Sequence, residues 1–327
     1  MTHLPINPSF TDALLAYRFL RPRVRHTPLE HSAPLSELLG TPVFVKWENQ
    51  QFCGSFKIRG ALFKMSRLTE AQQKRGVVTA SSGNHGQGVA LAAAQMRVKA
   101  TICVPASCPR TKQEAIRRLG GPWVDLQCIE GTYDDAEAEA HRRGEAGLTY
   151  VSSFEDPDIL CGASTLGIEM LLDEPDLDLI VMPAGGGGLM NGVSLAASTL
   201  RPRIELWGVQ SEASNPYVVS WDSGVVRDVE YGDTLADGLA GYIPQSLLDL
   251  AKTRMKGVVE VREEDIARAI ATLHRTHHQV VEGAGAVGVA ALLTGRPEVR
   301  GKKVGVVISG GNIDESRLLE VLRSQEG

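Results

Sequence analysis

Residues 179–189 read Leu-Ile-Val-Met-Pro-Ala-Gly-Gly-Gly-Gly-Leu, a short apolar run followed at once by four glycines. The run predicts a buried strand, and a helix is predicted to begin near Met190. Successive glycine amides between a strand and a helix form a concave site for anions, so this loop is a candidate phosphate site. The loop lacks the Gly-Lys-Ser/Thr ending of a nucleotide P-loop, which argues against a triphosphate.

The same order of strand and polar glycine loop occurs twice more. Residues 76–80 predict a strand that runs into Ser81-Ser-Gly-Asn-His-Gly-Gln87, and residues 303–308 predict one that runs into Ser309-Gly-Gly-Asn312. Apolar strands separated by helices indicate an α/β fold with parallel sheets covered by helices on both faces. Further strands are predicted over 42–46, 99–104 and 205–209, and helices over 89–95, 111–119 and 265–279.

Length and composition exclude several classes of protein. The chain has 327 residues, of which 43% are hydrophobic and 22% charged, which suits a two-lobed enzyme and excludes a disordered chain. Its formal net charge of -5 argues against a nucleic-acid or anionic-membrane partner. No apolar run is long enough to span a bilayer, and the N-terminus has no signal-peptide pattern, so we expect a cytoplasmic protein. Five cysteines without a C-x-x-C pair indicate buried reduced thiols.

Lys57 is the candidate catalytic amine. It stands in Gly54-Ser-Phe-Lys57-Ile-Arg-Gly60, where the glycines allow backbone to approach closely. The adjacent Phe56 would remove water from the amine and lower its pKa, as a Schiff-base lysine requires. The Ser81–Gln87 loop offers helix-start amides and polar side chains to a carboxylate or phosphate, with simple N-capping by Ser81 or Ser82 as the alternative. Ser309 places a hydroxyl at the strand ends where α/β ligands collect.

Three other patterns favour structural roles. Gly283-Ala-Gly-Ala-Val-Gly288 fits G-x-G-x-x-G, but a helix precedes it where a dinucleotide site needs a strand, so we expect close helix packing. His277 lies on the apolar face of its predicted helix and is expected to pack there and not to bind a ligand. The charged stretch 134–145 predicts a solvated helix face.

Taken together, these segments resemble the fold-type II family of pyridoxal-phosphate enzymes, whose fold is tryptophan synthase β-like. Within it they are most similar to the threonine/serine dehydratases and serine racemases. The motifs occur in family order from Thr27-Pro-Leu29 to Ser309-Gly-Gly-Asn312. The resemblance implies two domains. Residues 1–76 and 154–327 would form a large cofactor-binding domain, and residues 77–153 a small inserted domain that closes on the substrate.

The resemblance also implies roles for individual residues. Lys57 would carry pyridoxal 5'-phosphate and remove the α-proton once it is freed, and Ser82 would move a proton on the opposite face of the ring. The cofactor would be bound by Phe56, Lys57, Asn84, Gly185, Gly186, Gly187, Gly188, Leu189, Gly238, Glu282 and Ser309. The substrate carboxylate would be bound by Ser81, Ser82, Gly83, Asn84 and His85.

The implied reaction is loss of water from a β-hydroxy amino acid, by default L-threonine or L-serine, to give a 2-oxo acid and ammonia. A neutral Ser309 at the pyridine nitrogen would favour elimination over transamination. Three alternatives stay open: an amino-acid racemase, a dehydratase for a 3-hydroxy amino acid with an aryl or carboxyl β-substituent, and a non-catalytic amino-acid-binding protein. Homodimers are common in this family, so a homodimer is expected.

The sequence departs from the family pattern at two places. The family's usual divalent-cation site follows a strand with Gly-Val-Glu, whereas this chain has Gly208-Val-Gln210, and a neutral amide is a weaker ligand for a hard cation. We therefore predict no metal at Gln210, and Glu212 is the nearest substitute ligand. In Cys161-Gly-Ala-Ser-Thr165, Ala163 is expected to remove a polar side chain near the site and to favour a bulkier β-substituent.

Overall fold

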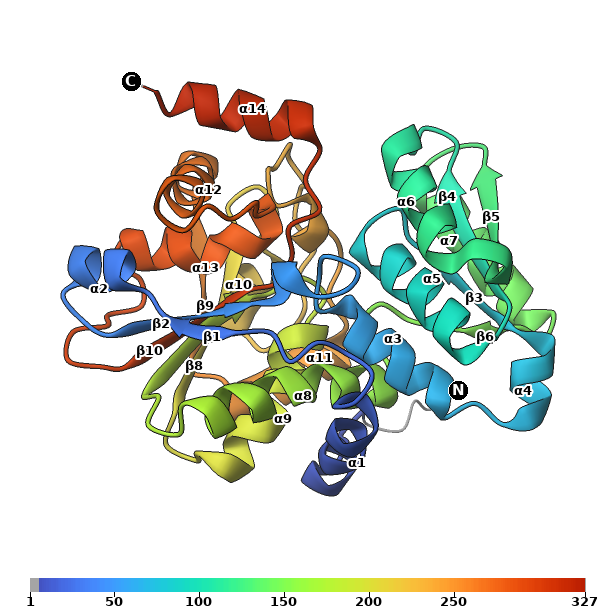
Figure 1. The fold of residues 1–327 in the computed structure, drawn as a ribbon, viewed down its shortest axis with the longest axis horizontal. Helices are drawn as coiled ribbons and strands as arrows, with labels where there is room; N and C mark the ends of the chain where they lie inside the picture. Colours follow the sequence, from blue (N-terminus) through green and yellow to red (C-terminus); the bar gives the residue numbers. More distant parts are fainter. Residues whose placement is uncertain (1–5, 327) are drawn as a thin grey trace.

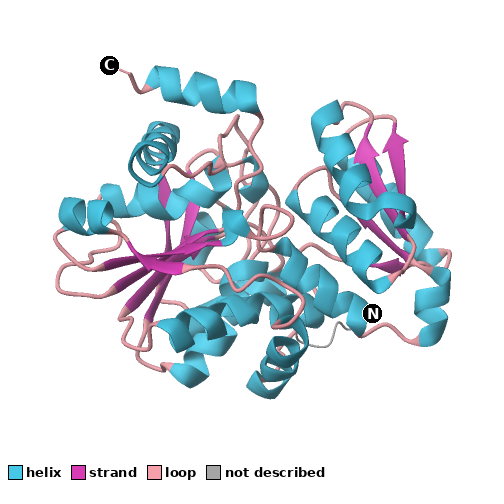
Figure 2. Ribbon diagram, in the orientation of Figure 1, coloured by secondary structure: helices cyan, strands magenta, loops and turns pink. Residues whose placement is uncertain are grey.

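The computed structural model describes residues 6–326, which form two sheets with helices packed around them (Figures 1 and 2). Neighbouring strands in both sheets run parallel, except that β1 and β2 are antiparallel. The larger sheet has the spatial order β1 (Leu29–His31), β2 (Val43–Trp47), β10 (Val304–Ile308), β7 (Leu179–Pro183), β8 (Glu205–Ser211) and β9 (Gly257–Val261). The smaller sheet has the order β5 (Val124–Ile129), β4 (Ala100–Pro105), β3 (Val77–Ala80) and β6 (Thr149–Tyr150).

Both faces of the larger sheet are buried, because alternate side chains of each strand enter different cores. Val181 and Val306 pack in one core with helices α2 (Ala33–Leu39), α12 (Glu263–His277) and α13 (Gly283–Leu293). Their neighbours Met182 and Val307 pack in the other with α8 (Pro157–Asp173), α9 (Gly188–Leu200) and α11 (Gln245–Arg254). These two helix layers lie on opposite sides of the sheet in Figure 1.

The smaller sheet is also covered on both faces. Helices α5 (Asn84–Met96) and α6 (Arg110–Gly120) share a core with Val77 and Ile102, and α7 (Tyr133–Glu145) packs on Val78 at the other face. Ile58 and Leu62 of α3 (Lys57–Ser66) belong to the α5 core, so α3 supports the smaller sheet from outside residues 77–153. The strands of the smaller sheet all lie within residues 77–153, and the two-domain division stays a prediction.

The remaining helices are α1 (Phe10–Leu20), α4 (Glu70–Arg75), α10 (Pro216–Trp221), α14 (Glu315–Ser324) and the short η1 (Glu48–Gln50), η2 (Gly121–Trp123) and η3 (Asp237–Leu239).

The predicted strands and helices are confirmed, except that one helix begins earlier than predicted. The helix predicted from residue 89 begins at Asn84, because its first turns hold glycines that close packing requires. A Cβ on Gly86 would lie 2.2 Å from the Ser81 carbonyl oxygen, and one on Gly88 would lie 3.0 Å from the Lys57 backbone. Strands β1, β5, β6 and β9 were not predicted; β1 and β6 have only three and two residues.

The close packing expected of the G-x-G-x-x-G segment and of His277 is confirmed, and the expectation for the thiols needs one correction. A Cβ on Gly283 would lie 2.0 Å from the Leu235 carbonyl oxygen, so the G-x-G-x-x-G segment is a tightly packed helix start. His277 Nε2 lies 2.7 Å from the Ser32 hydroxyl, and its ring lies 5.3 Å from that of Trp47. All five cysteines are free, but Cys128 is exposed, contrary to the expectation of buried thiols. No described helix has the length and apolar character needed to cross a membrane.

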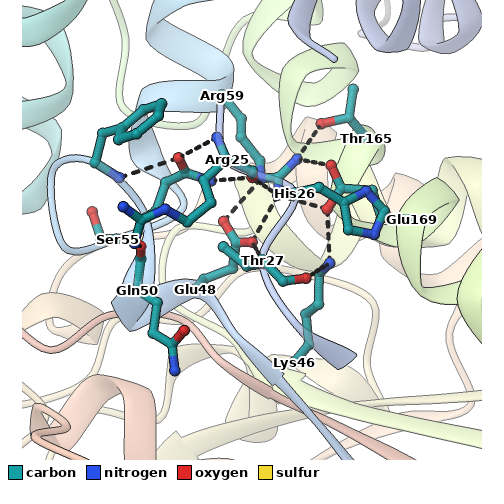
Figure 3. A network of polar contacts seen from close by, with 12 residues as sticks. Arg25, His26, Thr27, Lys46, Glu48, Gln50, Ser55, Arg59, Thr165 and Glu169 are labelled. Atoms are coloured by element: carbon teal, nitrogen blue, oxygen red, sulfur yellow. Dashed lines mark hydrogen bonds and ion pairs between the residues drawn. The ribbon is translucent and has the colours of Figure 1, made fainter. Parts of the chain in front are cut away.

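A buried charge network holds α3 against the larger sheet (Figure 3). The Arg59 guanidinium is fully buried and lies 2.7 Å from a carboxylate oxygen of Glu48 and 2.7 Å from one of Glu169. Lys46 on β2 also lies 2.7 Å from Glu169 on α8, so two cations face two carboxylates. Burial acts to lower the pKa of Arg59, but the two carboxylates raise it above its ordinary value. The network therefore joins β2, η1, α3 and α8 by ion pairs. Each of the four charged side chains depends on the others for a partner of opposite charge.

Replacing Arg59 with Met should destabilise the protein by about 3–5 kcal/mol, because Glu48 and Glu169 would stay buried without their shared partner. Urea unfolding measures the change. The control is Lys74→Ala, which removes a 2.6 Å ion pair with Glu70 whose side chains are 74% and 81% exposed. That pair is expected to leave the unfolding midpoint unchanged. Equal effects of the two substitutions would contradict the structural role of the network.

Candidate active site

A cavity of about 350 Å³ opens at the carboxyl ends of β3, β7 and β10. Parallel α/β sheets collect ligands at this edge. The cavity is lined by every residue that the sequence assigned to cofactor, substrate or proton transfer: Phe56, Lys57, Ser81, Ser82, Gly83, Asn84, His85, Gly185, Gly186, Gly187, Gly188, Leu189, Gly238, Glu282 and Ser309. Six separate segments of the chain thus meet at one place.

Lys57, the first residue of α3, offers a reactive amine to this cavity. Its Nζ donates to the Ser153 carbonyl oxygen at 2.9 Å and lies 5.3 Å from the centre of the Phe56 ring. Burial lowers the pKa of Lys57 to about 8, while Glu282 acts in the opposite direction. Among the described residues no carboxylate forms an ion pair with this amine. The amine therefore loses its proton more readily than an ordinary lysine and can act as a nucleophile or base.

The four glycines before α9 form a loop whose backbone amides are available to an anion. Within residues 6–326 the N–H groups of Gly185, Gly186, Gly187 and Gly188 have no hydrogen-bond acceptor. A Cβ on Gly186 would lie 2.4 Å from the Phe154 ring, and one on Gly187, whose φ is 102°, would lie 2.1 Å from Tyr217 Oη. Free amides at a helix N-terminus fit a phosphate group.

Ser309 supplies a hydroxyl that the protein leaves free. The residue is 4% exposed and lines the cavity, yet its Oγ has no hydrogen-bond partner among the described residues. Its carbonyl oxygen accepts from the Phe56 amide at 3.0 Å, which ties the end of β10 to the segment that carries Lys57. A buried hydroxyl without a protein partner is expected to bond to a ligand.

Asn84 connects the two sides of the cavity. Its Nδ2 donates to a Glu282 carboxylate oxygen at 2.6 Å, and its Oδ1 accepts from Asn312 Nδ2 at 2.6 Å. Burial, with a further contribution from Asp237, raises the pKa of Glu282 to about 7. Glu282 thus holds a proton more readily than an ordinary glutamate, and Asn84 at the start of α5 is bonded to the N-cap residue of α13.

The loop between β3 and α5 also leaves polar groups free. Ser81 Oγ accepts from the Gly83 amide at 3.3 Å, whereas Ser82 Oγ has no partner among the described residues. The N-cap residue is Gly83 without a side-chain cap, so N-capping by Ser81 or Ser82 does not occur. His85 Nε2 faces the Val151 carbonyl oxygen at 3.1 Å, and burial, aided by Lys57, lowers its pKa to about 3. The neutral His85 side chain is held by the protein, so its backbone amide is the group offered to a ligand.

Sequence reasoning missed several residues of the cavity wall. Ser153 and Phe154 follow the short strand β6, and Lys112 and Asp237 form a 3.2 Å ion pair. Asn312 could have been found, because it ends the Ser309-Gly-Gly-Asn312 motif. The remaining wall residues missed are Gln87, Tyr133, Glu137, Pro183, Leu239, Ala240, Gly241, Tyr242 and Ala284. Glu137 corrects the expectation that the whole charged face of 134–145 is solvated.

Gln210 and Glu212 lie outside the cavity wall. Gln210 is fully buried, and its Oε1 accepts from the amides of Tyr217 at 2.8 Å and Val218 at 3.3 Å, which caps α10. Glu212 is exposed and accepts from the Glu263 amide at 3.3 Å. The described residues hold no group of three or more His, Cys, Asp or Glu side chains placed to hold a metal ion. Ala163 does not line the cavity, contrary to its expected place near the site, because α8 buries it against Gly192 of α9; its effect on substrate preference stays a prediction.

Comparison with known proteins identifies the chain's relatives. A family model described as "Pyridoxal-phosphate dependent enzyme" matches residues 20–310. The L-threonine ammonia-lyase of Thermotoga maritima is 43% identical over 314 residues, which is 95% of this chain and 77% of that protein. The processed threonine deaminase isoform 2 of Solanum lycopersicum has a TM-score of 0.90 at 30% identity and covers 100% of this chain and 97% of its own. Maize serine racemase also has a TM-score of 0.90, at 28% identity, with 97% of each chain covered.

The Lys57 pKa predicts how pH controls cofactor uptake. Only the neutral amine attacks an aldehyde, so the rate at which cofactor-free protein takes up pyridoxal phosphate should rise as pH passes about 8. An ordinary lysine would show this rise about two pH units higher, near its unperturbed pKa. Stopped-flow absorbance between about pH 6 and pH 11 measures the profile across the ordinary lysine pKa, with Lys57→Ala as the control for uptake elsewhere. A rise centred on the ordinary lysine pKa would contradict the burial effect.

Proposed function

The chain belongs to the family of pyridoxal-phosphate dependent enzymes, and we propose that it removes water from L-threonine or L-serine to give a 2-oxo acid and ammonia. One observation carries this proposal. The Lys57 amine, the free amides of the glycine loop and the unpartnered Ser309 hydroxyl line a single cavity. These three features fit the aldehyde, the phosphate and the ring nitrogen of one cofactor.

The relatives support a β-elimination. The two named for threonine are an ammonia-lyase and a deaminase, and both are similar to this chain over nearly its whole length. The names of these two relatives favour an enzyme over a non-catalytic amino-acid-binding protein. The Lys57 environment agrees, because binding a carboxylate alone would not need a half-buried amine of lowered pKa.

The cofactor end of the site is proposed to work as follows. Bound pyridoxal phosphate supplies an electron sink for the charge left at Cα when the α-proton departs. The amides of Gly185–Gly188 would bind the phosphate at the positive end of α9. Ser309 would offer a neutral hydroxyl to the ring nitrogen, and Phe56 would pack beside the ring. Because the hydroxyl of Ser309 carries no charge, it gives less support to a protonated ring than a carboxylate would, which favours early loss of the β-hydroxyl.

The substrate end holds the amino acid by its carboxylate. Ser82 Oγ and the free amides at the start of α5 would bind this group, since anions bind at helix N-termini. Asn84 would orient the ring through its bonds to Glu282 and Asn312. Lys57 would then take the α-proton, because its lowered pKa suits a base near neutral pH. Loss of the β-hydroxyl as water follows, and hydrolysis releases ammonia.

A racemase is the second candidate. The TM-score of 0.90 to maize serine racemase and the free hydroxyl of Ser82 favour it, because a second proton carrier on the opposite face of the ring would return a proton to Cα. Chiral analysis of serine recovered from the reaction separates the two activities. A homodimer working in the cytoplasm stays a prediction.

The proposed reaction is tested with an amino-acid panel and 2-oxo acid detection. The holoprotein should form 2-oxobutanoate from L-threonine or pyruvate from L-serine, together with one ammonia per turnover. Lys57→Ala should lose at least about 1,000-fold in kcat, because it removes both the cofactor's attachment and the base. Lys74→Ala, a surface substitution, is the control. Unchanged turnover by Lys57→Ala would contradict the proposal.

A further inference from the structure

We propose that Glu137 sets the substrate class of this site by rejecting β-hydroxy amino acids that carry a second carboxylate on Cβ. The inference rests on the proposed function and narrows it to neutral β-substituents such as the methyl group of threonine. Glu137 would act by charge on the binding of substrate and takes no part in bond breaking.

Glu137 is placed beside the region proposed for substrate binding. Tyr133 and Glu137 are four residues apart on α7, so they share one face of that helix, and both line the cavity. Tyr133 Oη donates to the Ala80 carbonyl oxygen at 3.3 Å, immediately before Ser81. The Glu137 Oε1 accepts from Tyr150 Oη at 3.3 Å. This face of α7 therefore stands over the loop that would hold the α-carboxylate.

The wall offers a β-carboxylate no cation to pair with. The cavity-lining side chains able to carry positive charge in the described chain are Lys57, Lys112 and His85. Lys57 is committed to the cofactor, and Lys112 is already paired with Asp237 at 3.2 Å. His85 is neutral, because burial and Lys57 lower its pKa to about 3. Glu137 itself has no cationic partner within residues 6–326, so no ion pair offsets its charge at the cavity.

Glu137 raises the pKa of two tyrosines that line the same cavity. Burial raises the pKa of Tyr133, and Glu137 raises it further. The pKa of Tyr242 is raised by burial and then by Glu137 and Glu155. The Tyr242 ring lies 5.5 Å from the Phe154 ring, edge to face, which holds it at the cavity. These tyrosines offer Glu137 hydroxyl groups and no positive charge.

The consequence is discrimination between substrates that undergo the same chemistry. In either substrate the Cα–H and Cβ–O bonds break, water leaves, and a later hydrolysis returns one water and releases ammonia. A β-methyl group meets no charge penalty at Glu137, whereas a β-carboxylate would lose water and face a like charge without a counter-ion. The effect should therefore appear in KM and kcat/KM and not as a general loss of turnover.

The test compares kcat/KM for L-threonine and L-threo-3-hydroxyaspartate on the holoprotein. We expect wild type to favour L-threonine by at least about 100-fold and Glu137→Gln to reduce this ratio about tenfold, since the variant removes the like charge that repels the second carboxylate. Glu137→Lys should reduce it further. The control is Glu139→Gln on the same helix, whose carboxylate is paired with Arg142 at 2.7 Å and Arg143 at 2.6 Å and does not line the cavity. It should leave the ratio unchanged.

Each outcome decides between the two proposals. Turnover of L-threonine with equal use of hydroxyaspartate, or a ratio that neither Glu137 variant changes, would overturn the role of Glu137 and leave the proposed function intact. An equal change in Glu139→Gln would also overturn it, because the effect would then be general to α7. No 2-oxo acid from L-threonine, L-serine or hydroxyaspartate would instead contradict the proposed function.

Discussion

The structure depends on one buried cation that is shared by two carboxylates. Arg59 lies two residues after Lys57 in the first turn of α3 and is paired with Glu48 and Glu169, so the helix start that carries the reactive amine is fixed against η1 and α8. Buried charges of this kind contribute little net stability when paired, but leaving one unpaired is costly. The network therefore acts mainly to specify position: α3 has one place in which all four charges are satisfied, and Lys57 then lies in the cavity.

The site is assembled from segments that are far apart in the sequence and meet only because parallel strands end at the same edge. Gly185–Gly188 follow β7, Ser309 follows β10, and Ser82 and Asn84 follow β3 of the smaller sheet. The bonds of Asn84 to Glu282 and Asn312 join the two sheets' loops across the cavity. A displacement of the smaller sheet would break these hydrogen bonds. The positions of the substrate end and the cofactor end of the site therefore depend on each other.

The sequence predicts the parts of this site that short motifs carry, and it fails where tertiary packing decides. The proposed phosphate loop is recognisable from its run of four glycines. Lys57 is recognisable from the adjacent Phe56, and Ser309 from its position at the end of a strand. Glu137 has none: it is one of several acidic residues along its helix, and only the fold shows which turn faces the cavity. Ala163 illustrates the reverse error, because its motif resembles a site segment while α9 covers it. The partners of Arg59 lie 11 and 110 residues away, beyond any local pattern.

The most direct measurement locates the lysine that carries the cofactor. The holoprotein is reduced with borohydride, which fixes the imine as a stable amine, and is then digested and sequenced by mass spectrometry. The account predicts that the pyridoxyl phosphate mass lies on Lys57 and that Arg59→Met lowers the fraction of protein so labelled. Labelling of a different lysine, or a holoprotein with no reducible attachment, would contradict it.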